Sequence, residues 1–319
     1  MASPTGGTVP LRRTRSGSTS GNATPKPIQS AVTKATVRGR HKPKVKKGAF
    51  VKAAAKAGAD RDVAMAGSSG SSSAAVHSTS LAVPVVRQES SWDCGLACAR
   101  MALLALGADE DACSLRVLRS RLVSSDVWSI DLAYLLSEYS VVCEYLSATL
   151  DVPSPRRRTL PFYATSLLED GARVGALLAA APSYGVHVRQ CSLNANELWN
   201  TLRDGENVVI CLVDQRALHP GNGSDLSSPT SPAAAARSFF GHYVLIVGLD
   251  DATDSYVLRD PAGTQETMLV TMGRLERARR CRGTDEDLIV VPLYQDNAPC
   301  APTRDTSKIQ AVLAAVQAQ

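Results

Sequence analysis

The chain of 319 residues carries 35 Lys and Arg against 30 Asp and Glu, a formal net charge of +5. This length accommodates one folded domain of about 200 to 250 residues together with tails. No apolar run approaches the roughly 20 residues of a membrane-spanning helix, and no signal peptide is expected, which argues against an integral membrane protein. Eight cysteines without a CxxC pair argue against a zinc finger and favour reduced thiols of an intracellular protein.

The excess of positive charge belongs to the first 80 residues. They hold 14 Lys and Arg but only two acids, Asp60 and Asp62, so this segment is charged +12 and the rest of the chain −7. Its Ser, Thr, Gly and Ala content cannot offset the entropy lost on ordering, which predicts a disordered tail. The basic run at 38–47 is typical of a patch that contacts nucleic acid or an import receptor, so a cytoplasmic or nuclear protein is expected. An organelle transit peptide or a plain solvated tail are the other interpretations.

A polar turn that runs directly into an apolar helix opens the folded domain, which is expected over 81–294. The segment is PVVRQESSWDCGLACARMALLALG at 84–107, and Cys94 stands at the start of its helix. Asp93 is predicted to cap the helix, and Gly107 to end it in a left-handed conformation. The positive end of the helix dipole stabilises a thiolate at Cys94, although the charge of Asp93 opposes this effect.

Helices dominate the first half of the domain and strands the second half. Helices are predicted at 114–123, 129–139 (capped by Ser129), 169–181 and 194–203; strands are predicted at 141–146, 186–193, 208–213, 244–249, 256–259 and 288–293. A polar loop is expected at 151–160, a low-complexity insertion at 215–237, and a C-terminal tail with room for a short helix at 295–319. This order predicts an α+β domain.

Only one of the five histidines is well placed to act as a base for Cys94. Two lie in the tail, His187 lies inside a strand pattern, and His219 begins the predicted insertion, which would not hold an imidazole in a fixed position. His242 stands at the start of the apolar strand YVLIVG, where a sheet would hold it rigidly.

Two further polar residues complete a catalytic arrangement. Asp260 closes the next strand, and a hairpin through the acidic turn at 250–254 would bring its carboxylate beside His242 to orient the imidazole. Gln88 lies six residues before Cys94, where its amide and the backbone N–H of Cys94 would form an oxyanion hole. The predicted site is therefore Gln88, Cys94, His242 and Asp260. The alternative is a buried structural cysteine, a surface glutamine and an ordinary hairpin with polar ends.

The motifs WDCGLACARM, SIDLAYLL, GHYVLIVG, RDPA and GTDEDL resemble the guanylyl cyclase domain-containing protein family. The match runs from about Pro84 to Pro292, with the insertion at 215–237 as the main departure. That family is similar in turn to the papain-like fold of C39-type cysteine peptidases, which implies N-terminal helices followed by an antiparallel sheet. The resemblance places the Gln, Cys, His and Asp of those peptidases at Gln88, Cys94, His242 and Asp260.

Three functions follow from these observations. The first is a cysteine peptidase-like hydrolase of a peptide or other acyl substrate, which needs no cofactor or metal. The second is a guanylyl cyclase, as the family name states, which would need GTP and a divalent metal; the sequence offers no P-loop and no GxGxxG, and the acids at 284–287 are predicted to form a solvated turn rather than a metal site. The third is a binding module that keeps the fold without turnover.

Overall fold

The computed structural model describes residues 78–318, except 153, 220–238, 296–297 and 303–305. Residues 1–77 of the predicted tail and most of the predicted insertion therefore lie outside the described residues. Ser78–Ser80, which the composition assigned to the tail, instead form a strand that pairs with the sheet. Among the described helices, none combines the length and the apolar character needed to cross a membrane.

The strands form one mixed sheet. They are β1 (Ser78–Ser80), β2 (Glu144–Ser147), β3 (His187–Gln190), β4 (Asn207–Asp214), β5 (Gly241–Asp250), β6 (Ser255–Arg259), β7 (Met268–Thr271) and β8 (Leu288–Pro292). Their order is β3-β2-β8-β4-β5-β6-β7, and β1 pairs with β5. All pairs are antiparallel except β2 and β3, which are parallel. The expectation of an antiparallel sheet is thus wrong at this edge, because a long crossover connection permits parallel pairing.

The described helices are α1 (Cys94–Ala105), α2 (Leu115–Ser120), α3 (Ser129–Glu138), α4 (Ala164–Ala180), α5 (Ala195–Arg203), α6 (Gln215–Leu218), α8 (Met272–Arg279) and α9 (Lys308–Gln317), with short 3-10 turns η1 (Pro161–Tyr163) and η2 (Ala181–Tyr184). The α+β class is confirmed. Neither β7 nor α8 was predicted, and α6 occupies the first residues of the predicted insertion. Helix α9 packs against α3 and α4, with Ile309 and Val312 buried.

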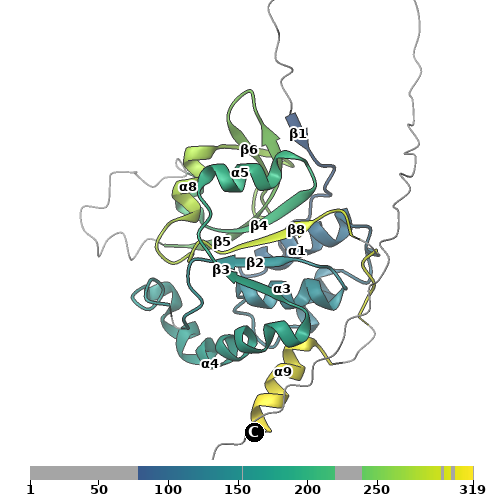
Figure 1. Ribbon diagram of the computed structural model, residues 1–319, viewed down its shortest axis with the longest axis vertical. Coiled ribbons are helices and arrows are strands. Elements are labelled where there is room, and N and C mark those ends of the chain that lie inside the picture. The colour runs from purple at the N-terminus through teal and green to yellow at the C-terminus, as the bar shows by residue number, and fades with distance from the viewer. Residues whose placement is uncertain (1–77, 153, 220–238, 296–297, 303–305, 319) are drawn as a thin grey trace, which may run out of the picture. The chain divides into compact units, whose positions relative to one another are not determined.

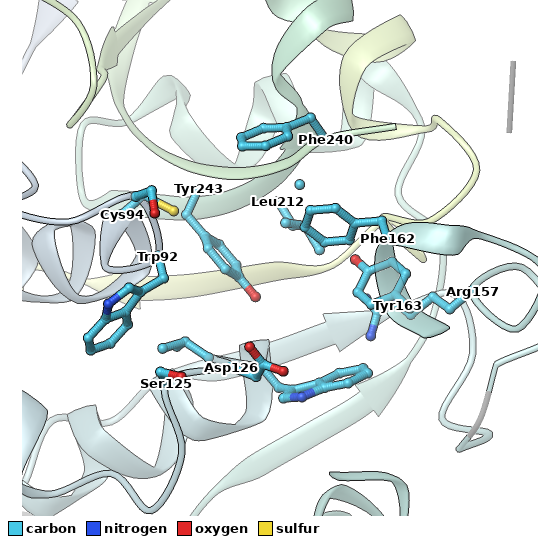
Figure 2. Close-up of a pocket in the computed structure, with 14 residues that line it drawn as sticks. Trp92, Cys94, Ser125, Asp126, Arg157, Phe162, Tyr163, Leu212, Phe240 and Tyr243 are labelled. Carbon is cyan, nitrogen blue, oxygen red and sulfur yellow. The ribbon is translucent and has the colours of Figure 1, made fainter. Parts of the chain in front are cut away.

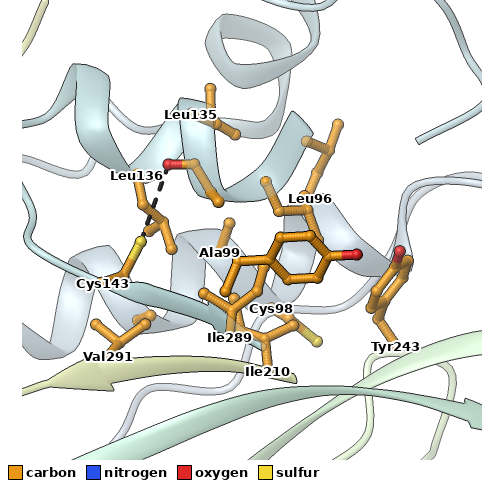
Figure 3. Packing of buried hydrophobic residues seen from close by; sticks show 14 of the residues in the cluster. Leu96, Cys98, Ala99, Leu135, Leu136, Cys143, Ile210, Tyr243, Ile289 and Val291 are labelled. Carbon is orange, nitrogen blue, oxygen red and sulfur yellow. Dashed lines mark hydrogen bonds between the residues drawn. The ribbon is translucent and has the colours of Figure 1, made fainter. Parts of the chain in front are cut away.

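Alternate residues of the central strands point to opposite faces of the sheet, as strand geometry requires. On one face, Ile210 and Leu245 join a core with α1 and α3. Figure 3 shows part of this core, including Ile210, Leu96 and Leu135. On the other face, Cys211 and Ile246 join a second core with α5 and α8. Figure 1 shows these two helix pairs on opposite sides of the sheet. Burial on both faces explains why β4 and β5 read as continuous apolar runs.

The sequence predicted the C-terminal end of α1 correctly but not the N-terminal cap of α3. Gly107 has φ 88° and its N–H donates to the Leu104 carbonyl at 3.0 Å, while the N–H of Ala108 donates to that of Leu103 at 3.0 Å. This Schellman arrangement confirms the predicted end of α1. Ser129, in contrast, is the first residue of α3 and not its cap, a position that Trp128 takes; the Ser129 hydroxyl donates to Asp287 at 2.7 Å.

Candidate active site

Cys94 is the first residue of α1, and its thiol lines a cavity although the residue is only 6% exposed. The preceding Asp93 occupies the N-cap position but makes no side-chain bond to the helix. Its carboxylate accepts from the backbone N–H of Ser90 at 2.9 Å and pairs with Arg119. The predicted side-chain cap is therefore wrong, and Arg119 offsets the charge expected to oppose a thiolate.

His242 and Asp260 lie at neighbouring strand ends of the β5–β6 hairpin, which closes between Asp250 and Ser255 as the acidic turn predicted. Nε2 of His242 is 2.8 Å from Oδ1 of Asp260, and both residues are 3% exposed. The thiol of Cys94 is a neighbour of this imidazole and contributes to raising the pKa of His242. Because Nε2 is occupied by Asp260, Nδ1 is the ring atom available to the thiol.

Charge stabilisation accompanies this geometry. Burial lowers the pKa of His242, but the hydrogen bond to Asp260 and the interaction with the Cys94 thiol outweigh it and raise the pKa to about 9. For the acid Asp260 burial acts in the opposite direction and raises the pKa, but hydrogen bonds from His219 and His242 hold this pKa well below its usual range. The arrangement therefore favours an imidazolium next to a carboxylate.

The side chain of Gln88 does not take the position predicted for an oxyanion donor. Its Nε2 donates to the carbonyl of Ser90 at 2.8 Å, and its Oε1 is buried without a partner. The backbone N–H of Gln88 donates to Pro261 at 3.2 Å, which fixes this turn beside Asp260. Gln88 is also not among the residues that line the cavity. Its amide would have to release Ser90 before it could reach an oxyanion.

The cavity beside Cys94 has a volume of about 420 Å³ and aromatic walls (Figure 2). Its rings belong to Trp92, Trp128, Phe162, Tyr163, Phe240 and Tyr243. Phe162 and Tyr163 come from η1, directly after the predicted polar loop, and their ring centroids lie 4.9 Å apart. Sequence reasoning missed this wall because the aromatic residues come from four separate segments of the chain.

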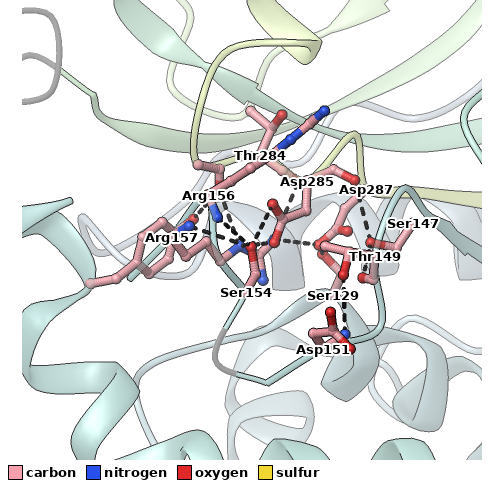
Figure 4. Close-up of polar contacts among 12 residues, drawn as sticks. Ser129, Ser147, Thr149, Asp151, Ser154, Arg156, Arg157, Thr284, Asp285 and Asp287 are labelled. Carbon is pink, nitrogen blue, oxygen red and sulfur yellow. Dashed lines mark hydrogen bonds and ion pairs between the residues drawn. The ribbon is translucent and has the colours of Figure 1, made fainter. Parts of the chain in front are cut away.

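Arg157 also lines the cavity, and its guanidinium lies over the rings of Trp128 at 5.1 Å and Tyr163 at 5.3 Å. The residue is buried and forms ion pairs with Asp285 at 3.0 Å and Asp287 at 2.7 Å (Figure 4). Asp287 also accepts from the hydroxyls of Ser129 at 2.7 Å and Tyr145 at 3.0 Å.

The acids at 284–287 therefore do not form a solvated turn. Each of Thr284, Asp285, Glu286 and Asp287 is at most 4% exposed. Glu286 pairs with Arg156 at 3.1 Å and accepts from the hydroxyl of Ser192. Among the residues that the structure describes, no cluster of three or more His, Cys, Asp or Glu could hold a metal ion.

His219 is the residue that sequence reasoning set aside and the structure brings to the site. Its Nε2 lies 2.9 Å from Oδ2 of Asp260, the oxygen that His242 leaves free. The signal in the sequence that could have located His219 is its position five residues after the end of β4. In the pairing of β4 with β5, Asp214 lies opposite Gly241, which is next to His242. His187, in contrast, lies exposed on β3.

The fold and the site together describe an α+β protein in which a thiol, an imidazole and a carboxylate meet beside an aromatic cavity. The chain belongs to the family described as Guanylylate cyclase, whose model matches residues 83–291. This confirms the family that the motifs indicated.

Two known proteins are similar to the chain. Guanylyl cyclase 1 of Arabidopsis thaliana is 35% identical over 217 residues, which cover 68% of this chain and 77% of that protein. A structural similarity links the chain to a putative C39-like peptidase from Bacillus anthracis, with a TM-score of 0.31, 12% identity, and coverage of 67% of this chain and 97% of that one.

Proposed function

We propose that the protein is a cysteine-dependent hydrolase that acts on a peptide or other acyl bond. The observation that carries this proposal is the position of His242, whose Nε2 lies 2.8 Å from Asp260 and whose pKa the neighbouring thiol of Cys94 helps to raise. Cys94 itself lines the cavity. A nucleophile, a base and a group that orients the base are the parts that nucleophilic catalysis requires.

Each group has a definite task in the proposed reaction. Nδ1 of His242 takes the proton of Cys94, the sulfur attacks the carbonyl carbon of the substrate, and Asp260 stabilises the resulting imidazolium. The imidazolium then gives its proton to the leaving group, and water, deprotonated by His242, releases the acyl group from sulfur. Backbone N–H groups at the start of α1 that have no partner within the helix would stabilise the developing oxyanion.

The cavity favours an apolar or aromatic group next to the reacting carbonyl. Trp92 and Tyr243 lie beside Cys94, and Phe162 and Phe240 stand across the cavity (Figure 2). Aromatic walls of this kind bind planar or branched apolar groups, and polar groups at the rim then set the orientation. Ser125 and Asp126 supply polar groups in this cavity.

The experiment that tests this function compares thiols within the full chain. Iodoacetamide-alkyne is added at pH 7 and each labelled cysteine is quantified by peptide mass spectrometry. Cys300 is the internal control, because it is exposed but has no histidine partner in the part of the chain described here. Burial raises the pKa of Cys143 and of Cys211 to about 12, so both should stay unlabelled.

The expected result is labelling of Cys94 faster than Cys300, and loss of that advantage in His242→Gln. Hydrolysis of fluorogenic esters with aromatic acyl groups should then be abolished in Cys94→Ala but not in Cys98→Ala. If Cys94 labels more slowly than Cys300 in the wild-type chain, the hydrolase is excluded and a binding module on this fold takes its place.

The relative named Guanylyl cyclase 1 supports a second candidate, synthesis of cyclic GMP from GTP. This activity would need a divalent metal, and the residues described do not fit one: Asp285 and Asp287 are paired with Arg157, and Glu286 with Arg156. Incubation with GTP and Mg²⁺ or Mn²⁺, followed by mass spectrometry for cyclic GMP, tests it. Product formation that survives Cys94→Ala would favour the cyclase over the hydrolase.

A further inference from the structure

Two imidazoles share the carboxylate of Asp260. His242 contacts Oδ1 at 2.8 Å and His219 contacts Oδ2 at 2.9 Å, both through Nε2. An ionised carboxylate only accepts hydrogen bonds, so each Nε2 must carry the proton. The carboxylate of Asp260, which orients His242 in the proposed hydrolase, therefore accepts a hydrogen bond from an imidazole at each of its two oxygens.

The backbone holds His219 firmly at this place. Its N–H donates to the carbonyl of Gln215 at 2.9 Å, and the N–H of Gln215 donates to Phe240 at 2.9 Å, two residues before His242. Leu218 is fully buried in the second core. Residue 219 is thus tied through α6 to the strand that carries the proposed base.

His219 also separates Asp260 from solvent. Its side chain is 28% exposed, whereas that of Asp260 is 3% exposed. A buried carboxylate interacts more strongly with a neighbouring cation than one that water screens. Among the described residues, Arg87 donates to the backbone carbonyl of Asp260 at 2.9 Å, and the thiol of Cys98 lies near enough to interact with its charge.

We propose that His219 is a positioning residue of the site: its Nε2–H fixes Oδ2 of Asp260 and shields it from water, so that Oδ1 stays directed at His242. The effect of His219 on catalysis rests on the proposed function as a hydrolase. His219 itself touches neither Cys94 nor the cavity among the contacts described, so it acts through Asp260 and is not a catalytic residue.

The test follows His242 directly in the full chain. With only five histidines, ¹⁵N-histidine NMR resolves each imidazole, and His242→Gln assigns its signals. In His219→Ala water reaches Oδ2, so the pKa of His242 should fall by about one unit or more. In His219→Gln a neutral N–H donor and most of the cover remain, and the pKa should stay within about 0.3 unit of the wild type.

Alkylation of Cys94 by iodoacetamide at pH 7 supplies a second measurement. It should slow by up to about tenfold in His219→Ala, because the thiolate–imidazolium pair forms less readily, and recover in His219→Gln. A residue that only supports the fold would lower the urea midpoint of His219→Ala without moving the titration of His242. That outcome, or a His219→Gln variant that behaves like His219→Ala, overturns the inference.

The two proposals fail in different ways. If the hydrolase proposal is wrong, Cys94 is no more reactive than Cys300 in the wild type, while the titration of His242 still reports whether His219 acts on it. If only the present inference is wrong, Cys94 is reactive and depends on His242, yet both variants at position 219 titrate like the wild type.

Discussion

Nη2 of Arg157 lies 2.7 Å from Oδ2 of Asp287, and the two residues are 130 positions apart in the chain. Nε of Arg157 also donates to the carbonyl of Gly283 at 3.1 Å. The contact fixes the segment before η1 to the segment before β8, and it orients the guanidinium against the aromatic wall of the cavity. A buried ion pair with its remaining donors and acceptors satisfied gives a defined geometry, whereas the loss of one partner leaves a buried charge.

Asp287→Asn should therefore destabilise the protein strongly, by about 3 kcal/mol or more, because it leaves the buried Arg157 with one carboxylate. Urea unfolding measures the change. Arg156→Gln is the matched control: its side chain is 47% exposed, and its pair with Glu286 should contribute about 1 kcal/mol or less. Equal losses in the two variants would contradict the structural role of the Arg157–Asp287 pair.

Asp260→Asn should lower the pKa of His242, since burial then acts without the compensating charge. Any Cys94-dependent hydrolysis should fall on the order of 100-fold or more, as expected when a base loses its orienting carboxylate. Kinetics on a fluorogenic ester measure this loss. Asp250→Asn, at the other end of the same hairpin, should retain activity, and a similar loss there would point to damage of the hairpin.

The stability of the protein should fall as the pH rises from about 6.5 to about 9. The pKa of His242 is raised from an ordinary 6.5 to about 9 in the folded state, so the folded state binds this proton more tightly. Its contribution is complete below the unfolded pKa and is lost as the pH passes through the folded one; its size is on the order of 3 kcal/mol. Urea melts across this range should show the decline, and His242→Gln should flatten it.

Gly95→Ala should be destabilising by about 1 to 3 kcal/mol, because overpacking a tight interior costs free energy. A Cβ at this position would lie 2.9 Å from Cδ1 of Leu132 and 3.1 Å from Cδ2 of Tyr243. Since Gly95 follows Cys94, the labelling of Cys94 should slow as well. Gly175→Ala in α4 meets nothing within 4 Å and should stabilise the protein by about 0.5 to 1 kcal/mol; a loss there would argue against this packing.

Local patterns predicted the elements that carry the site. The apolar spacing before Gly107 located α1, and the acidic turn at 250–254 located the hairpin that brings Asp260 to His242. Both signals lie within a few residues of the structure they specify, so no knowledge of tertiary contacts was needed.

The burial of the acids at 284–287 and the positions of His219 and Gln88 depend on tertiary contacts, which local sequence patterns do not reveal. The acids at 284–287 resemble a surface turn in sequence, and their burial depends on partners that are distant in the chain, among them Arg156 and Arg157 about 130 residues earlier. The position of His219 beside Asp260 depends on the pairing of β4 with β5. The polar residues that follow His219 in the sequence gave no sign of this position. The spacing of Gln88 from Cys94 gave no indication that the carbonyl of Ser90 would compete for its amide.

The place of β8 in the sheet constrains the order in which the chain can fold during synthesis. Among the described strands β8 is the last in sequence, yet it lies between β2 and β4, so it joins the parallel pair to the part of the sheet that holds His242 and Asp260. Until the ribosome has released residues 288–292, both flanking strands have unpaired edges, which attract other extended chains. At about 5 to 20 residues per second, the interval between completion of β4 and of β8 lasts several seconds. A chaperone that covers β4 during that interval would protect the nascent protein from aggregation.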